Sequence, residues 1–427
     1  MDSLVKESAT VGKGSTDLFG NVKDRKVGYA RGAILRDEVS EVTRQRRAYG
    51  LIRSRFERDG DSGIYNLTGL IRGFPLKDED KPYLPSYIHF IARYQNDLET
   101  LALRHLGGDP DHHDCFLSTR VSAGMLAIML TLLERDAKVL SLVVADSSHP
   151  SVSQAVRIAG GQFSEVIGLD AYVKAFDSGV RPDAVVITTI SPSKKHLPQA
   201  DTIEAIAIAR KHGALVILDD AHMAARISIY DEKPGLALDA DATVWSLDKH
   251  MVGPRSGMVA GKKEYLAKIK ARALALGVEA QLGQVLAGLR AVQQFDPSEI
   301  RKAHRMAGEL FTSFNADCGG HAYMAGAGVA LSGDRLLEAA VTRSGKQPAI
   351  VPIEAVAFTA MRLLESFGAV TIPAVGMPGA SCTYRLMLYP DGLKMGVDAL
   401  LSASREVFNE LADVVDKPQL VRPVLLS

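Results

Sequence analysis

Cysteine is scarce in this sequence of 427 residues, which contains only Cys115, Cys318 and Cys382. The set is odd in number and has no CxxC spacing, which argues against a disulfide framework and against a structural zinc site. We therefore expect a protein of a reducing compartment that holds no metal.

An excess of either charge and a long apolar run are also missing. Fifty Lys and Arg residues balance fifty Asp and Glu residues, so no overall field would attract a nucleic-acid backbone. No stretch approaches the ~20 apolar residues of a membrane helix, and residues 1–20 lack the apolar core of a signal peptide. These absences predict a cytoplasmic protein without a membrane or nucleic-acid partner.

What the sequence does contain is enough hydrophobic residue, 47%, to bury a large core. Short apolar runs alternate with helical patterns from residue 115 to residue 260, a rhythm that predicts a mostly parallel sheet covered by helices on both faces. We expect an N-terminal arm and helix over residues 1–60, a large α/β domain over 61–295 and a smaller α+β domain over 296–427.

Two regions outside the large domain have specific expectations. Residues 34–58 have apolar residues at helical spacing, and the arginines among them are matched by acids, so we expect a helix with a solvated charged face and not an RNA-binding patch. Residues 1–30 are expected to form a loose arm or a strap across a partner subunit. In the C-terminal part we expect strands over 329–331, 370–375 and 383–388, with helices over 353–367 and 397–411.

The most informative stretch is DATVWSLDKHMVGPRSGMVAG, residues 241–261, where Lys249 lies between two apolar runs typical of strands. A lysine held there loses hydration, which lowers the pKa of its amine and makes it nucleophilic toward a carbonyl. Lys249 is therefore either a Schiff-base lysine or a surface cation that follows a strand.

A second motif, VILDDAHMAA, lies thirty residues upstream and places Asp219 and His222 where a strand leaves the sheet, the usual ligand position in an open α/β sheet. An aspartate there can keep a pyridine nitrogen protonated, so that the ring of pyridoxal phosphate (PLP) acts as an electron sink. The histidine can reach the phenolic oxygen of that ring. Asp220 replaces Asp219 if the strand register differs by one residue.

Small residues precede an apolar helix at Ser122, Ala123 and Gly124, where backbone N–H groups and the helix N-terminus can bind a phosphate. Ser246, three residues before Lys249, is expected to share that phosphate, and Arg255 can add charge within the subunit or across a dimer contact. His149 follows another strand, where it either stacks on the cofactor ring or only faces solvent in a helix-capping turn.

Two arginines are possible substrate ligands. Arg385 lies within an apolar strand, where a guanidinium needs an anion, either a substrate carboxylate or a structural acid. Arg72 lies in a glycine-punctuated segment and either grips a substrate anion or pairs with a local acid.

Together, DxAH and the SxxKxxxGPxxG that follows about thirty residues later resemble the fold-type-I PLP enzymes. KHMVGPRSG and DDAHMAA are similar to serine hydroxymethyltransferases, whereas SLDKHMVGPRSGMVAGKKEYLAKIK resembles selenocysteine synthases (seryl-tRNA selenium transferases) over a longer run. YNLTGLIRGFP is similar to an archaeal-type branch of synthase-like PLP proteins. The resemblance covers residues 65–295 and implies a fold-type-I PLP transferase with a mostly parallel, seven-stranded-type sheet, active as a homodimer or larger homo-oligomer.

The resemblance also implies an enzyme that acts on a small-molecule substrate, an amino acid, through an external aldimine. We expect Lys249 to remove the α proton before elimination or replacement at the β or γ carbon, with Arg385 or Arg72 on the substrate carboxylate. Aldol-type cleavage of a β-hydroxy amino acid and transamination remain open. Outside enzymes, the alternative is a catalytically silent PLP-binding scaffold.

Overall fold

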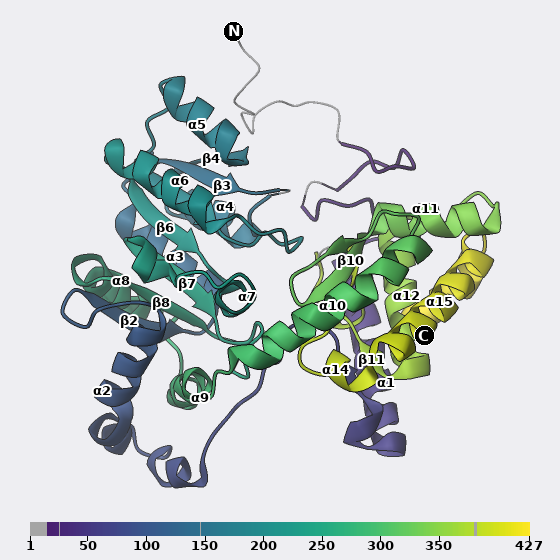
Figure 1. The fold of residues 1–427 in the computed structure, drawn as a ribbon, viewed down its shortest axis with the longest axis horizontal. Helices are drawn as coiled ribbons and strands as arrows, with labels where there is room; N and C mark the ends of the chain where they lie inside the picture. Colours follow the sequence, from purple (N-terminus) through teal and green to yellow (C-terminus); the bar gives the residue numbers. More distant parts are fainter. Residues whose placement is uncertain (1–14, 25, 146, 380–381) are drawn as a thin grey trace. The chain divides into compact units, whose positions relative to one another are not determined.

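The computed structural model describes residues 15–24, 26–145, 147–379 and 382–427, which form two compact units (Figure 1). Unit 1 is Leu70–Pro297, and unit 2 combines residues 15–69 with Ser298–Ser427. The sequence had predicted three parts with boundaries at residues 60 and 295, whereas the structure joins the N-terminal helix to the C-terminal residues. Residues 1–14 of the predicted arm lie outside the described residues.

Unit 1 contains the predicted seven-stranded sheet, with strand order β2-β8-β7-β6-β5-β3-β4. β8 pairs antiparallel with both of its neighbours, and the other pairs are parallel. The mostly parallel α/β fold predicted from the sequence is therefore confirmed. The strands are β2 (His113–Ser118), β3 (Lys138–Val143), β4 (Gln162–Ile167), β5 (Ala184–Thr188), β6 (Leu215–Asp219), β7 (Ala242–Ser246) and β8 (Gly257–Lys262).

Helices cover both faces of this sheet because alternate residues of its apolar strands point to opposite sides (Figure 1). In β5, Ala184 and Val186 pack with α3 (Val121–Leu132), α4 (Pro150–Ile158) and α8 (Lys263–Ala275). Val185 and Ile187 pack on the other face with α5 (Leu169–Asp177) and α6 (Gln199–Lys211). That face continues with α2 (Tyr87–His105), α7 (Met223–Ile229) and α9 (Leu282–Gln293) around Trp245.

Unit 2 has a three-stranded antiparallel sheet and one short parallel pair, β1 with β11. Of the predicted strand 370–375, Val370 belongs to β11 and Thr371 is also extended, but Ile372–Val375 forms a helix because Pro373, without an N–H, fits a first helical turn. Its elements are α1 (Glu38–Asp59), β1 (Tyr65–Asn66), α10 (Pro297–Asp317), β9 (Tyr323–Met324), β10 (Gly328–Ser332), α11 (Gly333–Ser344), α12 (Pro352–Phe367), β11 (Ala369–Val370), α13 (Ile372–Val375), β12 (Thr383–Met387), α14 (Gly392–Met395), α15 (Val397–Val414) and α16 (Pro418–Leu426).

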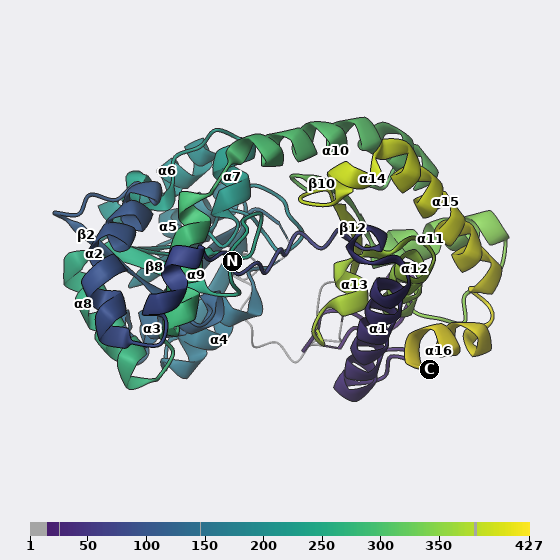
Figure 2. The same ribbon diagram turned by 90° about the horizontal axis from the view of Figure 1, so that it is seen from below.

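α1 lies beside α13 and α16 (Figure 2), and its arginines bind the ends of other helices of unit 2. Arg44 is buried and donates to the carbonyl oxygens of Pro373, Ala374 (2.7 Å) and Gly376 (3.0 Å). The prediction of a solvated charged face is wrong for Arg44, and it is also wrong for Arg47 and Arg55. The last carbonyls of a helix lack partners within it, and guanidinium groups supply them. Arg47 donates to Val424 (2.8 Å) of α16, and Arg55 donates to Glu365 (2.9 Å) of α12.

A buried carboxylate fixes the chain that leads into α1. Glu354, in the first turn of α12, accepts hydrogen bonds from the backbone N–H groups of Ile34 (2.6 Å), Leu35 (3.0 Å) and Val351 (3.2 Å). A Cβ at Gly32 would lie 2.1 Å from an oxygen of the same carboxylate, so a larger residue there would displace the Glu354 side chain. These contacts explain why the N-terminal helix belongs to unit 2.

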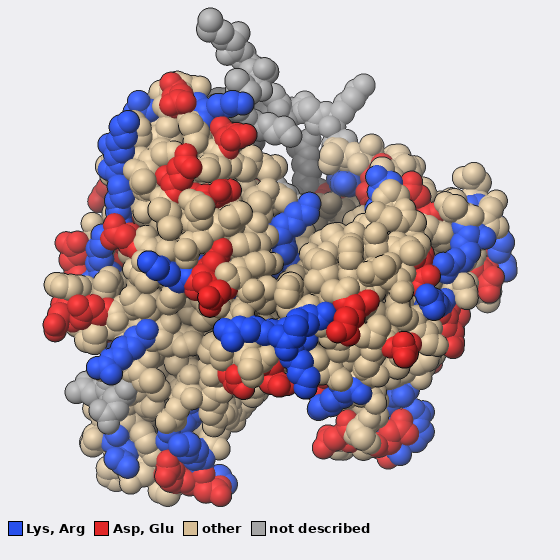
Figure 3. Space-filling model, in the orientation of Figure 1, with Lys and Arg blue, Asp and Glu red and all other residues tan. Residues whose placement is uncertain are grey.

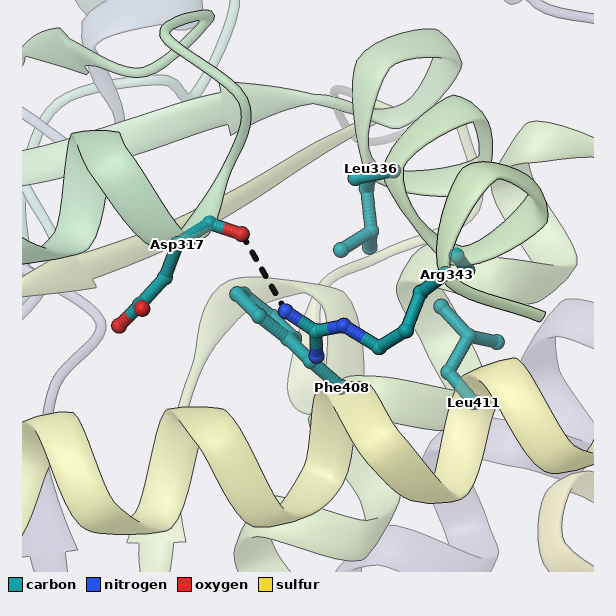
Figure 4. A pocket seen from close by; sticks show the side chains of 7 residues that line it. Asp317, Leu336, Arg343, Phe408 and Leu411 are labelled. Carbon is teal, nitrogen blue, oxygen red and sulfur yellow. Dashed lines mark hydrogen bonds between the residues drawn. The ribbon is translucent and has the colours of Figure 1, made fainter.

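On the face shown in Figure 3, Lys and Arg side chains lie interspersed with Asp and Glu. No helix in the described part of the chain is long and apolar enough to cross a membrane. A small recess of unit 2 is lined mainly by apolar residues of α11 and α15, and Arg343 there donates to the carbonyl oxygen of Asp317 (3.4 Å; Figure 4).

Replacing Glu354 by Ala should lower the free energy of unfolding by about 3 kcal/mol, because it leaves three backbone N–H groups in largely buried surroundings without an acceptor. Denaturant unfolding measures the change. Glu406→Ala on the exposed side of α15 is the control and should change stability by less than about 0.5 kcal/mol. Equal losses in the two variants would contradict this role of Glu354.

Candidate functional site

Lys249 lies in the loop between β7 and β8, and its backbone is held from a second direction by residues 70–71. Lys249 forms an isolated antiparallel bridge with Leu70, and the Ile71 N–H donates to the Asp248 carbonyl oxygen (2.8 Å). The lysine is half-buried, and the next residue, His250, is buried with a left-handed φ of 56°. The predicted order of strand, loop and strand around Lys249 is confirmed, and residues 70–71 hold the loop backbone at Asp248 and Lys249.

Two adjacent aspartates end β6, and their environments differ. Asp220 is fully buried and forms a two-pronged ion pair with Arg226 (2.6 and 3.0 Å), and it accepts a hydrogen bond from Thr189 (2.7 Å). Although burial by itself would lower the pKa of Arg226, its two acidic neighbours raise that pKa. Asp220 is therefore already neutralised by a cation.

Asp219, by contrast, receives one long hydrogen bond, from the Ala221 N–H at 3.3 Å. Burial raises the pKa of Asp219 above its usual value, while the positive charge of Lys249 acts in the opposite direction. A buried carboxylate with remaining acceptor capacity fits a cationic N–H donor such as a protonated pyridine nitrogen. Of the two aspartates, the structure thus favours Asp219 for the predicted role.

His222 lies three residues beyond Asp219, immediately before α7, and is buried. Its Nε2 lies 2.8 Å from Nζ of Lys194, a residue in the turn that follows β5. Its ring also lies 6.1 Å from that of His250, centroid to centroid. The sequence interpretation overlooked Lys194 and His250, although Lys194 follows a parallel strand at the same sheet edge as Asp219.

His149 caps helix α4, and its Nδ1 accepts a hydrogen bond from the Ser151 N–H (3.2 Å). Solvent reaches the ring, yet surrounding protein lowers its pKa to about 4 by desolvation, assisted by the positive charges of Lys249, Lys194 and Arg120. An Nδ1 that accepts leaves the proton on Nε2 of a neutral ring. His149 therefore caps α4, and its neutral ring also lies close enough to Lys249 for the lysine charge to affect its pKa.

The predicted phosphate turn is corrected by the structure. Ser122, Ala123 and Gly124 lie within the first turn of α3, because the Arg120 carbonyl accepts from both Ala123 and Gly124 N–H (3.0 Å each). A Cβ at Gly124 would lie 2.5 Å from Val259, so this glycine serves close packing on β8. Of the three residues, Ser122 offers an exposed hydroxyl, and no described side chain caps this helix end.

The N-terminus of α3 nevertheless lies next to the lysine loop. A Cβ at Gly257, the first residue of β8, would lie 2.6 Å from the backbone nitrogen of Val121. Only glycine allows this approach of the two backbones. The site therefore brings together the start of α3, the loop of Lys249 and the end of β6.

Ser246 and Arg72 meet at an aspartate. The Ser246 hydroxyl donates to the Asp248 carboxylate (2.6 Å), and Arg72 Nε lies 3.5 Å from the other oxygen of that carboxylate. Ser246 thus directs its proton to Asp248, which does not support the predicted phosphate role. Arg72, with a left-handed φ of 53°, pairs with a local acid, as the simpler sequence interpretation had it.

Arg385 and Arg255 belong to different units of the chain. Arg385 belongs to unit 2, where it pairs in register with Ala330 of β10, and burial lowers the pKa of its guanidinium. Arg255 is half-buried in the loop before β8. No group of three His, Cys, Asp or Glu residues that could hold a metal ion occurs within the described ranges.

The sheet order and the two-unit division define the class: the chain has the fold of the fold-type-I PLP-dependent enzymes. Residues 97–328 match the aminotransferase class I and II family, and residues 323–391 match the UPF0425 C-terminal domain. A UPF0425 pyridoxal phosphate-dependent protein of Methanothermobacter thermautotrophicus is 31% identical over 396 residues, which cover 92% of this chain and 100% of that protein. The chain belongs to this family of PLP-dependent proteins, which confirms the predicted cofactor class.

Solved structures of low identity share the fold. Alanine–glyoxylate aminotransferase of Nostoc sp. has a TM-score of 0.58 at 13% identity, over 81% of this chain and 96% of that chain. A SepCysS–SepCysE N-terminal domain complex has a TM-score of 0.57 at 16% identity, over 83% and 97%. At such identities the similarity concerns the fold alone.

The two aspartates should respond oppositely to neutralisation. Asp219→Asn should raise the thermal midpoint of the apoprotein at pH 7 by ~2 °C or more, because a carboxyl whose folded pKa is raised destabilises the fold when ionised. This gain should vanish as the pH falls to about 3.9, where the unfolded chain is protonated too. Asp220→Asn should instead cost about 3 kcal/mol by leaving Arg226 underpaired. Scanning calorimetry checks both, and a gain in both variants would refute the assignment.

Proposed function

We propose that this protein is a PLP-dependent enzyme in which Lys249 carries the cofactor as a Schiff base. The main support is the contrast at the end of β6, where Asp220 is neutralised by Arg226, whereas Asp219 keeps acceptor capacity and is close enough to Lys249 for that charge to affect its pKa. In this proposal Asp219 binds the pyridine nitrogen and His222 binds the phenolic oxygen. PLP supplies an electron sink that stabilises negative charge at the α carbon of a bound amino acid.

The remaining residues of unit 1 would hold the other parts of the cofactor. Ser122 and the N–H groups at the start of α3 provide donors for the phosphate, and Arg120 adds positive charge beside them. His149, neutral at pH 7, is suited to stack on an aromatic ring. Ser246 is assigned to Asp248 instead of the phosphate.

For the reaction, we propose that Lys249 also serves as the base that takes the α proton, followed by elimination or replacement at the β or γ carbon. Arg385, with Arg72 as the alternative, would bind the substrate carboxylate. The selenocysteine-synthase-like run 246–270 supports this choice, and the hydroxymethyltransferase-like segments support aldol cleavage. Transamination is the second candidate, because residues 97–328 match the class I and II aminotransferases.

Lys249 should be the residue that becomes labelled when the holoprotein is reduced. Borohydride should bleach the yellow protein and leave one reduced pyridoxyl phosphate on the peptide that contains Lys249, as measured by peptide mass spectrometry. Lys249→Ala should lose both the colour and the label. Lys195→Ala, which removes an exposed lysine, is the control and should keep both. A label on another lysine would contradict the proposal.

A panel of amino acids should separate the candidate reactions. Keto acid and ammonia that appear together without an added acceptor would support elimination. Glycine with an aldehyde would indicate aldol cleavage, and keto acid that needs a second keto acid would indicate transamination. No product and no change in the visible spectrum with any amino acid would favour a silent PLP-binding scaffold.

The family assignment also supports our proposal of a cytoplasmic homodimer or larger homo-oligomer. Many fold-type-I sites include residues from a second subunit, so the mass in solution should be at least twice that of one 45.9 kDa chain. Multi-angle light scattering measures this mass, and a fully active monomer would contradict the proposal.

A further inference from the structure

A second lysine of unit 1, Lys194, lies beside the proposed cofactor residues. Its Nζ is 2.8 Å from Nε2 of His222. Burial raises the pKa of Asp219 and lowers that of His149, and the positive charges of Lys249 and then Lys194 act to lower both. Lys194 therefore acts electrostatically on the same group of residues as Lys249.

Backbone hydrogen bonds and a ring contact hold the turn that carries Lys194. Lys194 has a left-handed φ of 72°, and its N–H donates to the Ser191 carbonyl (2.8 Å). Beyond it, His196 forms a bridge with Ile190 and stacks on Tyr230 with ring centroids 3.8 Å apart. A left-handed backbone at a lysine is uncommon and is retained here by the surrounding contacts.

The turn is also linked to the aspartate pair. His196 Nε2 lies 2.9 Å from Glu232, and Glu232 pairs with Arg226 (3.0 Å), the partner of Asp220. A single chain of buried or half-buried contacts thus runs from Asp220 to the turn of Lys194. The position of Lys194 relative to the end of β6 is set by this network.

The contact between Lys194 and His222 determines where the histidine proton resides. A lysine ammonium has only hydrogen-bond donors, so in this contact Lys194 donates. Nε2 of His222 must then accept, which leaves the ring proton on Nδ1. Protonating His222 fully would place two cations about 3 Å apart, which is unfavourable.

We propose that Lys194 is a positioning residue that keeps His222 neutral with its proton on Nδ1, so that Nδ1–H is the donor for the phenolic oxygen of the cofactor. The last clause rests on the proposed function, whereas the position of the proton does not. The alternative is an incidental contact of a surface lysine, which would leave the two tautomers of His222 mixed.

Nitrogen-15 NMR of the histidine side chains in the apoprotein tests the first part. The His222 signal, identified by its loss in His222→Gln, should show a protonated Nδ1 and an unprotonated Nε2. Lys194→Met should shift the population toward protonated Nε2, and Lys194→Arg, a donor of the same charge, should restore the wild-type pattern. Lys195→Met removes the exposed neighbouring lysine and should leave the signal unchanged. Identical His222 signals in wild type and Lys194→Met would overturn the proposal.

A titration with PLP tests the second part, with quenching of the single tryptophan, Trp245, as the readout. Lys194→Met should weaken PLP binding about tenfold and shift the visible absorption band, while Lys194→Arg and Lys195→Met should bind as wild type does. Unchanged binding and an unchanged band in a Lys194→Met protein whose His222 proton has moved would overturn the link to the cofactor. Failure of the wild type to bind PLP, with the NMR result intact, would instead refute the proposed function alone.

Discussion

The buried ion pair between Asp220 and Arg226 is the interaction on which the proposed site depends. Two carboxylates next to each other at the end of a strand cannot both remain charged in a buried site without compensation. Arg226 compensates one of them, and Asp219 keeps the capacity to bind a cationic donor. The same arginine holds Glu232, and through Glu232 and His196 it fixes the turn of Lys194.

The parallel sheet places these parts at one edge. β5 leads into the turn of Lys194, β6 ends at Asp219, and β7 leads into the loop of Lys249, so neighbouring strands deliver side chains to the same end of the sheet. The antiparallel β8 then returns past the start of α3, where Gly257 allows contact between the two backbones. The start of α3, with the backbone N–H donors of a helix N-terminus, thus lies close to the loop of Lys249.

Unit 2 holds its N-terminal helix through hydrogen bonds between charged side chains and backbone groups. Arg44, Arg47 and Arg55 supply hydrogen-bond donors to carbonyl groups at the ends of α13, α16 and α12, where a helix leaves its own acceptors unpaired. Glu354 acts in the opposite sense, because its carboxylate accepts hydrogen bonds from backbone N–H groups of the segment before α1. Both contacts join residues more than 300 positions apart in the sequence, so the unit cannot be divided at residue 60.

Apolar periodicity was enough to predict the sheet and the loop of Lys249, because these depend on neighbours within a few residues. The motifs around Asp219 and Lys249, through their resemblance to PLP enzymes, predicted the cofactor class, whereas the roles of Asp219 and His222 stay predictions. Which aspartate is neutralised, that Ser246 binds Asp248, and that Lys194 meets His222 depended on hydrogen-bond partners and backbone conformations that the linear pattern does not contain. The first turn of α3 began earlier than expected because the Arg120 carbonyl captured two amides. The arginines of α1 appeared solvated in the sequence because their partners are backbone carbonyls, which every residue has, and only tertiary packing selects which carbonyls are left unpaired beside them.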